Sequence, residues 1–216
     1  MGYKTLCKAL LLAGLTISGA AMGAGASSTM LSDTCAACHG VDGNSQGPAT
    51  PAIAGLSRGY FVAAMLAYKY GKDQAAIDKA IAAIPGVDAD EFEVLARNGT
   101  IMSRIATGYT DGEIGQMADY FAKKSFVRHL QSGDKALAKR GKKLHEKNCE
   151  KCHEDGGTTS VDDVGILAGQ WMPYLTNALT DFQAKHRKMP KKMAKKMKKL
   201  KANDLKALVH YYGTQR

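Results

Sequence analysis

The sequence predicts an all-α fold in which two helical domains follow one another as copies of an internal repeat. The run Cys-x-x-Cys-His occurs twice, and its two copies end at His39 and His153. An Ala-Gly pair lies 15 and 16 residues after each histidine, and a tyrosine follows each at 21 residues, at Tyr60 and Tyr174. We find no alternation of apolar and polar residues that would be typical of strands.

Residues 1–26 have the features of a secretory signal peptide. Two lysines precede an apolar run at 9–17, and small residues then lead to a plausible cleavage site at 24–26. The apolar run is too short to span a bilayer comfortably, so we expect cleavage and export to the periplasm without a stable membrane anchor. Cleavage also removes Cys7, which leaves four cysteines, all of them in the two motifs.

The first domain is expected at residues 27–124, with a short helix leading into its Cys-x-x-Cys-His motif. Glycines and a proline at 39–51 indicate a loop. Residues 74–98 contain alternating Ala and Ile interrupted by Pro-Gly, which predicts a helical hairpin. Thr110 and Glu113 form a capping-box pattern, which predicts a helix that continues through Lys124.

A linker is expected at 125–133, followed by the second domain at 134–216. Asn203 is the predicted N-cap of its last helix. Both domains end on a helix that carries an aromatic pair, Tyr120-Phe121 in the first and Tyr211-Tyr212 in the second. Each domain is small for a stable hydrophobic core. A large apolar group bound to each domain would supply the missing centre of its core.

The Cys-x-x-Cys-His run is the attachment signal of c-type haem, so the sequence predicts two covalently bound haem c groups. The thiols that form the thioether links are Cys35, Cys38, Cys149 and Cys152. A four-cysteine zinc site is the first alternative, but it would leave the histidine after each pair unused. A thioredoxin-like redox pair is the second, and it requires a βαβ context.

The histidine of each motif is the expected axial iron ligand on one side, and methionine thioether is expected on the other. Met102 and Met193 occupy the same register, with an apolar or aromatic residue at +7, an apolar residue at +12 and a tyrosine at +18. We therefore predict the ligand pairs His39 with Met102 and His153 with Met193. Met189 remains an alternative, because a Met-Pro dipeptide is a common ligand setting. The weaker candidates are His129, His145, His186 and His210.

The net charge of +10 is unevenly distributed. Residues 27–133 hold 9 Lys and Arg against 11 Asp and Glu, whereas residues 134–216 hold 19 against 9. Residues 185–201 alone contain ten basic residues and no acid. Export argues against nucleic acid as the partner, so this run predicts either an acidic protein partner near the second haem or simply a solvated helix face.

Several stretches resemble a known family, namely residues 101–109, 143–153, 166–175, 181–182 and 191–194. They are similar to the dihaem cytochrome subunit of flavocytochrome c sulfide dehydrogenase. The Ala-Gly-Gln run at 168–170 and the methionine registers are also found in the wider dihaem c-four group of cytochromes. The segment at 171–175 and the Lys-Lys-Met run at 191–193 favour the sulfide dehydrogenase subunit. The resemblance implies two tandem cytochrome c domains and the same thioether and axial ligands.

The resemblance also implies partners. A FAD-containing flavoprotein subunit would oxidise sulfide, and a soluble cytochrome would accept the electrons. This chain would then transfer electrons and carry no catalytic residue of its own. The extra residues at 74–98 depart from the family pattern. A free-standing dihaem shuttle to a terminal oxidase and a dihaem peroxidase are the alternatives.

Overall fold

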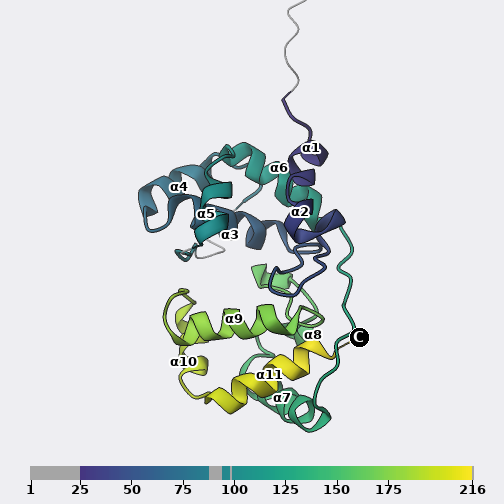
Figure 1. Cartoon of the computed structure of the whole chain (residues 1–216). Helices are drawn as coiled ribbons and strands as arrows, with labels where there is room; N and C mark the ends of the chain where they lie inside the picture. Colours follow the sequence, from purple (N-terminus) through teal and green to yellow (C-terminus); the bar gives the residue numbers. More distant parts are fainter. Residues whose placement is uncertain (1–24, 88–93, 98, 216) are drawn as a thin grey trace, which may run out of the picture.

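The computed structural model describes residues 25–87, 94–97 and 99–215, which form two helical lobes joined by an extended segment (Figure 1). Within these ranges there is no strand, and the one β-bridge pairs Arg97 with Arg187. The first lobe contains α1 (Ser28–Asp33), α2 (Ala36–His39), the 3-10 helix η1 (Val41–Gly43), α3 (Arg58–Tyr70), α4 (Gln74–Ala82), α5 (Thr100–Ala106) and α6 (Asp111–Ala122). The second contains α7 (Lys135–Asn148), α8 (Glu154–Gly157), η2 (Val161–Asp163), α9 (Met172–Gln183), α10 (Lys191–Met197) and α11 (Ala202–Gly213).

The core of the first lobe lies between α3, α5 and α6, and α1 packs on the outer side of α6. Helix α3 begins after Ser57, whose side chain accepts a hydrogen bond from the backbone N–H of Tyr60. Its apolar residues fall on one face, which turns toward α6. There the ring of Phe61 stacks on that of Phe121, with centroids 5.3 Å apart.

The predicted capping box at the start of α6 is confirmed. Thr110 Oγ1 accepts from the N–H of Glu113 at 3.2 Å, and Glu113 Oε2 accepts from the N–H of Thr110 at 2.7 Å. Two otherwise unpaired donors of the first helical turn are thereby satisfied. The helix ends at Ala122, two residues before the predicted end at Lys124.

The expected cap of the last helix is wrong by two positions. Helix α11 begins at Ala202, so Asn203 lies inside its first turn and Lys201 occupies the N-cap. The backbone N–H of Lys201 donates to Asp204 Oδ2 at 2.9 Å. A carboxylate in the first turn satisfies this donor and also faces the positive end of the helix dipole, so no asparagine cap is needed.

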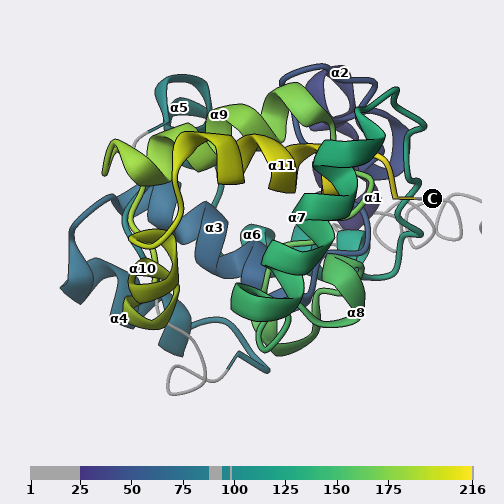
Figure 2. The ribbon, with the colours of Figure 1, turned by 90° about the horizontal axis from the view of Figure 1, so that it is seen from below.

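The core of the second lobe is built around α11, which packs against α7 and α9 (Figure 2). Its buried residues include Leu175, Leu208 and Tyr212. Helices α7 and α11 approach very closely at Gly141, where an added Cβ would lie 2.1 Å from the Ala207 carbonyl oxygen. Glycine is required there because any larger side chain would force the helices apart.

Part of the extra segment at 74–98 is described. Its first half forms α4, which Asp73 caps by accepting from the N–H of Ala76 at 3.1 Å, and which buries Ile77 and Ile81 in the first core. Residues 94–97 form no helix, and the rest of the predicted second arm lies outside the described residues. Residues 1–24, most of the predicted signal peptide, also lie outside them.

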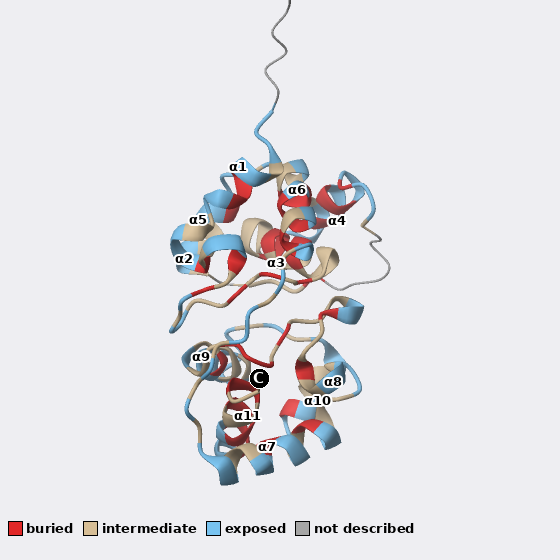
Figure 3. Ribbon diagram, turned by 90° about the vertical axis from the view of Figure 1, so that its right-hand side faces the viewer, coloured by how far each residue is buried: buried red, intermediate tan, exposed pale blue. Residues whose placement is uncertain are grey.

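The segment between the lobes is attached to both of them. Residues 125–134 form no helix. Asn44 of the first lobe donates to the Ser125 carbonyl at 3.0 Å, and Gln131 donates to the carbonyl of Gln170 in the second lobe at 2.9 Å. Buried loop segments lie where the two lobes face each other (Figure 3). We infer that the linker holds the lobes in one arrangement.

Candidate haem sites

The first Cys-x-x-Cys-His motif forms a single helical turn. The backbone N–H groups of Cys38 and His39 donate to the Cys35 carbonyl at 3.2 and 2.8 Å. This turn presents both thiols and the imidazole from adjacent positions. Neither thiol is in a disulfide; Cys35 is half-buried and Cys38 is exposed.

His39 is oriented for binding a metal through its outer nitrogen. Its ring is buried, and Nδ1 lies 2.8 Å from the Pro51 carbonyl oxygen. Because a carbonyl accepts only, Nδ1 carries the proton and Nε2 keeps its lone pair. Burial lowers the pKa of His39 against the opposing effect of the Pro51 carbonyl. A neutral imidazole with a free Nε2 is the form that binds iron.

The second motif repeats this geometry at Cys149, Cys152 and His153. The N–H groups of Cys152 and His153 donate to the Cys149 carbonyl at 3.1 and 2.9 Å. Burial lowers the pKa of His153, and the backbone of Gly165, at the same 12-residue offset as Pro51 from His39, opposes it. The contact between the His153 ring and the Gly165 backbone is looser than that between His39 and Pro51, since His153 Nδ1 has no partner at hydrogen-bond geometry among the described residues.

The zinc alternative does not match this arrangement. The cysteine pairs lie in separate lobes, and the described part of the chain contains no group of three or more His, Cys, Asp or Glu side chains placed to hold a metal ion. Each motif instead has two thiols outside any disulfide and one imidazole with a free nitrogen. These groups fit covalent haem.

Met102 lies on α5 in contact with the apolar core of the first lobe, and Cys35 contacts the same core. The start of α5 is close to α3, because an added Cβ on Gly99 would lie 2.7 Å from the ring of Tyr68 and 3.6 Å from Met102 Cβ. The fold therefore brings the predicted thioether ligand and the first haem motif to one apolar cluster.

Both candidate methionine ligands contact the core of the second lobe, as do Met172 and Met197. Met193 lies on α10 and Met189 lies just before it, and both are half-buried against the same cluster. Leu144 of α7, five residues before Cys149, contacts this cluster as well. The geometry serves both candidates equally, so Met193 remains a prediction that rests on the repeat.

The other histidines have different partners. His145 is fully buried in α7, where Nδ1 lies 2.8 Å from the Tyr212 hydroxyl and Nε2 contacts the Glu150 carboxylate. The ring of His129 stacks on Trp171 at 4.4 Å. His210 Nδ1 accepts from the backbone N–H of Asp134 at 3.0 Å, and His186 is exposed. Sequence spacing contains no signal for the contact with Tyr212, which lies on α11, 67 positions after His145.

Buried hydrogen bonds join the two haem domains. Gln170 Nε2 donates to the Ala52 carbonyl at 2.8 Å, and Gln170 Oε1 accepts from the Ala52 N–H at 3.0 Å. Trp171 Nε1 donates to the Ser45 carbonyl at 2.9 Å. The residues of Ala-Gly-Gln-Trp, which follow the second motif, thus bind the loop that follows the first. The sequence identified these residues through the repeat and the family resemblance, but not as a contact between the domains.

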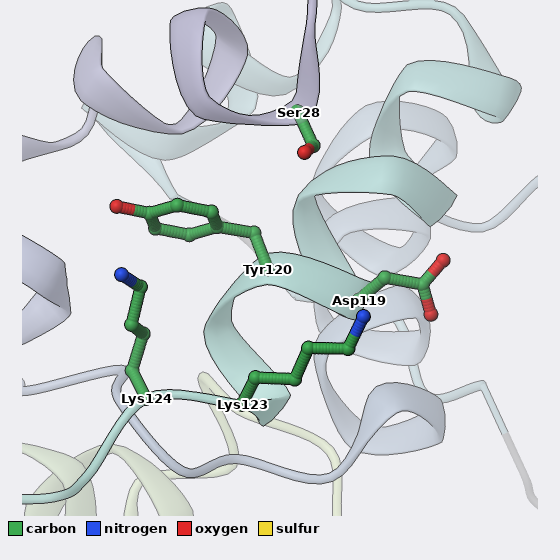
Figure 4. A pocket seen from close by; sticks show the side chains of 5 residues that line it. All are labelled: Ser28, Asp119, Tyr120, Lys123 and Lys124. Atoms are coloured by element: carbon green, nitrogen blue, oxygen red, sulfur yellow. The ribbon is translucent and has the colours of Figure 1, made fainter.

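A small pocket of about 230 Å³ lies on the surface of the first lobe, beside the C-terminal end of α6 (Figure 4). Ser28, Asp119, Tyr120, Lys123 and Lys124 line it. On its rim, Lys124 forms a 2.7 Å ion pair with Asp42. The lining contains no cysteine, histidine or methionine, so the pocket is separate from the haem motifs.

Comparison with known proteins agrees with this geometry. The family model "Cytochrome c" matches residues 25–124, and the model "Cytochrome C oxidase, cbb3-type, subunit III" matches residues 136–211. Cytochrome c4 of Stutzerimonas stutzeri is 30% identical over 194 residues, which cover 85% of this chain and 84% of that protein. The cytochrome subunit of sulfide dehydrogenase from Chlorobaculum tepidum is 34% identical over 100 residues, which cover 46% of this chain and 68% of that protein.

The fold is shared with solved structures. The crystal structure of reduced recombinant cytochrome c4 from Pseudomonas stutzeri superposes with a TM-score of 0.68 and 26% identity, over 88% of this chain and all of that one. Each lobe is thus a cytochrome c domain. Two such domains each contain a haem motif, and cytochrome c4 of Stutzerimonas stutzeri matches 85% of this chain. This chain therefore belongs to the dihaem cytochrome c4 family of electron-transfer proteins and holds two covalently bound haem c groups.

Proposed function

We propose that this protein works in the periplasm as the electron-accepting subunit of a sulfide dehydrogenase whose other subunit carries FAD. The observation that carries the proposal is the similarity to the sulfide dehydrogenase cytochrome subunit of Chlorobaculum tepidum, 34% over 100 residues. The segments at 101–109, 166–175 and 191–194 add support from the residues themselves. Export is supported by the composition of residues 1–26.

The chain's own residues define what each site does. Four thioether links would fix the haem groups, and the pairs His39 with Met102 and His153 with Met193 would fill both axial positions. Bound haem supplies a reversible one-electron change at iron. With both positions filled, the protein side chains exclude sulfide and peroxide from iron, so the oxidation of sulfide belongs to the flavoprotein.

The number of sites suits a flavin donor. A reduced flavin carries two electrons, and the residues of the two sites would hold two haem groups, each able to accept one electron. The buried contacts between Gln170 and Ala52 hold the domains that carry these sites against each other. Electrons then leave one at a time to a single-electron carrier.

The basic run supports a docking site for that carrier at the second domain. Helix α10 and its flanks expose lysines around Met193, with ten basic residues and no acid at 185–201. A field of one sign raises the encounter rate with a partner of opposite sign. We therefore propose an acidic soluble cytochrome as the acceptor.

Purification of the native complex tests the donor. We expect the chain to copurify with a subunit that shows flavin absorbance, and we expect sulfide to reduce both haem groups only in that complex. A chain that always purifies alone, without flavin, contradicts the proposed donor.

A free-standing dihaem shuttle is the second candidate. It is favoured by the cytochrome c4 of Stutzerimonas stutzeri, which matches 85% of this chain. Such a shuttle would be reduced by a respiratory donor without flavin and would pass electrons to a terminal oxidase. High-spin haem that reacts with peroxide in the wild-type protein would instead indicate a peroxidase, because that activity requires an open iron position.

A further inference from the structure

One peptide group connects the predicted iron ligand of the first domain to a side chain of the second. His39 Nδ1 donates to the Pro51 carbonyl at 2.8 Å. The N–H of the next residue, Ala52, donates to Gln170 Oε1 at 3.0 Å. The Pro51 carbonyl and the Ala52 N–H belong to the same planar peptide group. A chain of two hydrogen bonds therefore joins the His39 ring to the other domain.

This chain of hydrogen bonds is shielded from solvent. Ala52 and Gln170 are each 2% exposed, and His39 is 9% exposed. In such an interior the effective dielectric constant is low, so hydrogen bonds are electrostatically stronger than in water. Hydrogen bonds that follow one another also polarise one another. A change at Gln170 should therefore be felt at the His39 ring.

The second domain holds the Gln170 side chain in one orientation. The N–H of Gly169 donates to the carbonyl of Tyr212 on α11 at 2.8 Å, and Gln131 Nε2 donates to the Gln170 carbonyl at 2.9 Å. Gln170 Nε2 donates to the Ala52 carbonyl at 2.8 Å. Because the amide nitrogen faces that carbonyl, the amide oxygen faces the Ala52 N–H.

The peptide group transmits the effect of this acceptor to the histidine. Resonance shares electrons between the N–H and the carbonyl of one peptide, so an acceptor at the Ala52 N–H makes the Pro51 oxygen more negative. A more negative oxygen binds the Nδ1 proton of His39 more strongly, and the ring becomes a more basic ligand. A more basic ligand stabilises the ferric state, which lowers the reduction potential.

The repeat does not provide the same connection in the opposite direction. Gln170 lies 17 residues after His153, and the residue 17 positions after His39 is Leu56. The Leu56 side chain is buried and has no polar atom. On the second histidine, Nδ1 has no partner at hydrogen-bond geometry among the described residues. The second domain therefore acts on the histidine of the first, and the first domain has no equivalent side chain.

We propose that Gln170 is a positioning residue of the second domain that lowers the reduction potential of the first haem through the Pro51–Ala52 peptide and His39. This effect favours electron transfer from the first haem to the second. The role of Gln170 depends on the two covalent haem groups and is independent of the sulfide donor. Loss of the flavoprotein partner would leave it unchanged.

The relative potential of the two haem groups measures this effect. Gln170→Met keeps the side-chain volume but removes the amide, so the potential of the first haem should rise relative to the second. We expect the equilibrium constant between them to change about threefold, which is about 28 mV for a one-electron couple. Redox titration of the full holoprotein followed by NMR resolves the two haem groups through contacts with their own domains. An unchanged or reversed difference would overturn the proposal.

A second hydrogen bond between the domains supplies the matched control. Trp171→Phe removes the bond from Nε1 to the Ser45 carbonyl, which is 2.9 Å long and does not involve the Pro51–Ala52 peptide. The relative potential should stay at its wild-type value in this variant. An equal change in Trp171→Phe and Gln170→Met would assign the effect to a loosened interface and reject the proposed role of Gln170.

The His39 ring can also be observed directly. In the reduced, diamagnetic holoprotein with labelled histidine, the Nδ1 proton of His39 should move upfield in Gln170→Met, because its hydrogen bond is weaker. It should not move in Trp171→Phe. Gln170→Ala gives the same test if the methionine variant fails to retain haem. An unmoved His39 signal would refute the connection even if the potentials change.

Discussion

The side chain of Gln170 forms two hydrogen bonds with the backbone of Ala52, a residue 118 positions earlier in the chain. The amide donates to the carbonyl at 2.8 Å and accepts from the N–H at 3.0 Å, and both residues are buried. A neighbouring β-strand would pair with a backbone N–H and carbonyl in a similar way. The two hydrogen bonds therefore fix the position of a loop of the first domain against the second.

Replacing Gln170 by alanine should therefore weaken the coupling between the unfolding of the two domains. The change leaves the N–H and the carbonyl of Ala52 buried without partners, which costs about 2–4 kcal/mol. We expect urea unfolding of the holoprotein to begin at lower denaturant concentration and to broaden as the domains unfold independently. Gln183→Ala, at the exposed end of α9, is the control and should match the wild type. Identical transitions for the two variants would show that the contact does not couple the domains.

The axial methionines can be separated by single substitutions. Met102→Ala and Met193→Ala should each convert one ferric haem from low to high spin, because the thioether that completes the coordination is lost. Met189→Ala, on the same core cluster, should keep both haem groups low-spin. Absorption and magnetic circular dichroism spectra measure the change. High-spin haem in Met189→Ala with a normal Met193→Ala spectrum would exchange the two assignments.

Charge reversal on α10 tests the proposed docking surface. Lys192 and Lys195 are exposed and flank Met193, so Lys192→Glu with Lys195→Glu should slow electron transfer to an acidic acceptor about 10-fold or more at low salt. The rate should also become less sensitive to ionic strength. Stopped-flow reduction of the acceptor measures both.

The matched control for that double variant lies on another helix. Lys135 and Lys139 are both exposed on α7 and lie outside the basic run. Replacing both by glutamate changes the net charge by the same amount as the double variant on α10. If Lys135→Glu with Lys139→Glu slows the reaction equally, the effect is one of net charge, and the lysines of α10 are a solvated helix face.

The start of α11 makes a prediction about pH. The backbone N–H of Lys201, and then Arg140, hold the pKa of Asp204 below its ordinary value of 3.8. A carboxylate with a lowered folded-state pKa stabilises the fold above its unfolded pKa, and this contribution is lost as pH falls through the folded value. We expect Asp204→Ala to destabilise by about 1 kcal/mol at pH 7. The difference from the wild type should vanish in strong acid.

Asn203→Ala is the comparison for that change. Its side chain is exposed in the first turn and is not the N-cap, so thermal unfolding should remain within experimental error of the wild type. A larger loss for Asn203→Ala than for Asp204→Ala would restore the asparagine as the cap.

Local features of this protein were predictable from the sequence. The haem motifs depend on the spacing of three side chains within one turn, and the capping box at Thr110 depends on a hydrogen-bond pattern three residues long. The repeat also identified the two domains and the methionine registers. The cap at Asn203 was predicted wrongly, because Asp204 competes for the same turn and a carboxylate interacts more strongly with the helix N-terminus.

The tertiary structure alone decided which distant residues meet. The contacts of Gln170 with Ala52 and of Arg97 with Arg187 join segments 118 and 90 positions apart, and the burial of His145 against Tyr212 joins α7 to α11. Sequence spacing describes a residue's neighbours within a helix turn, whereas these pairs depend on how whole helices and domains pack. The number and kind of haem groups are therefore local properties of the sequence, and the interface that lies between the haem domains is a property of their packing.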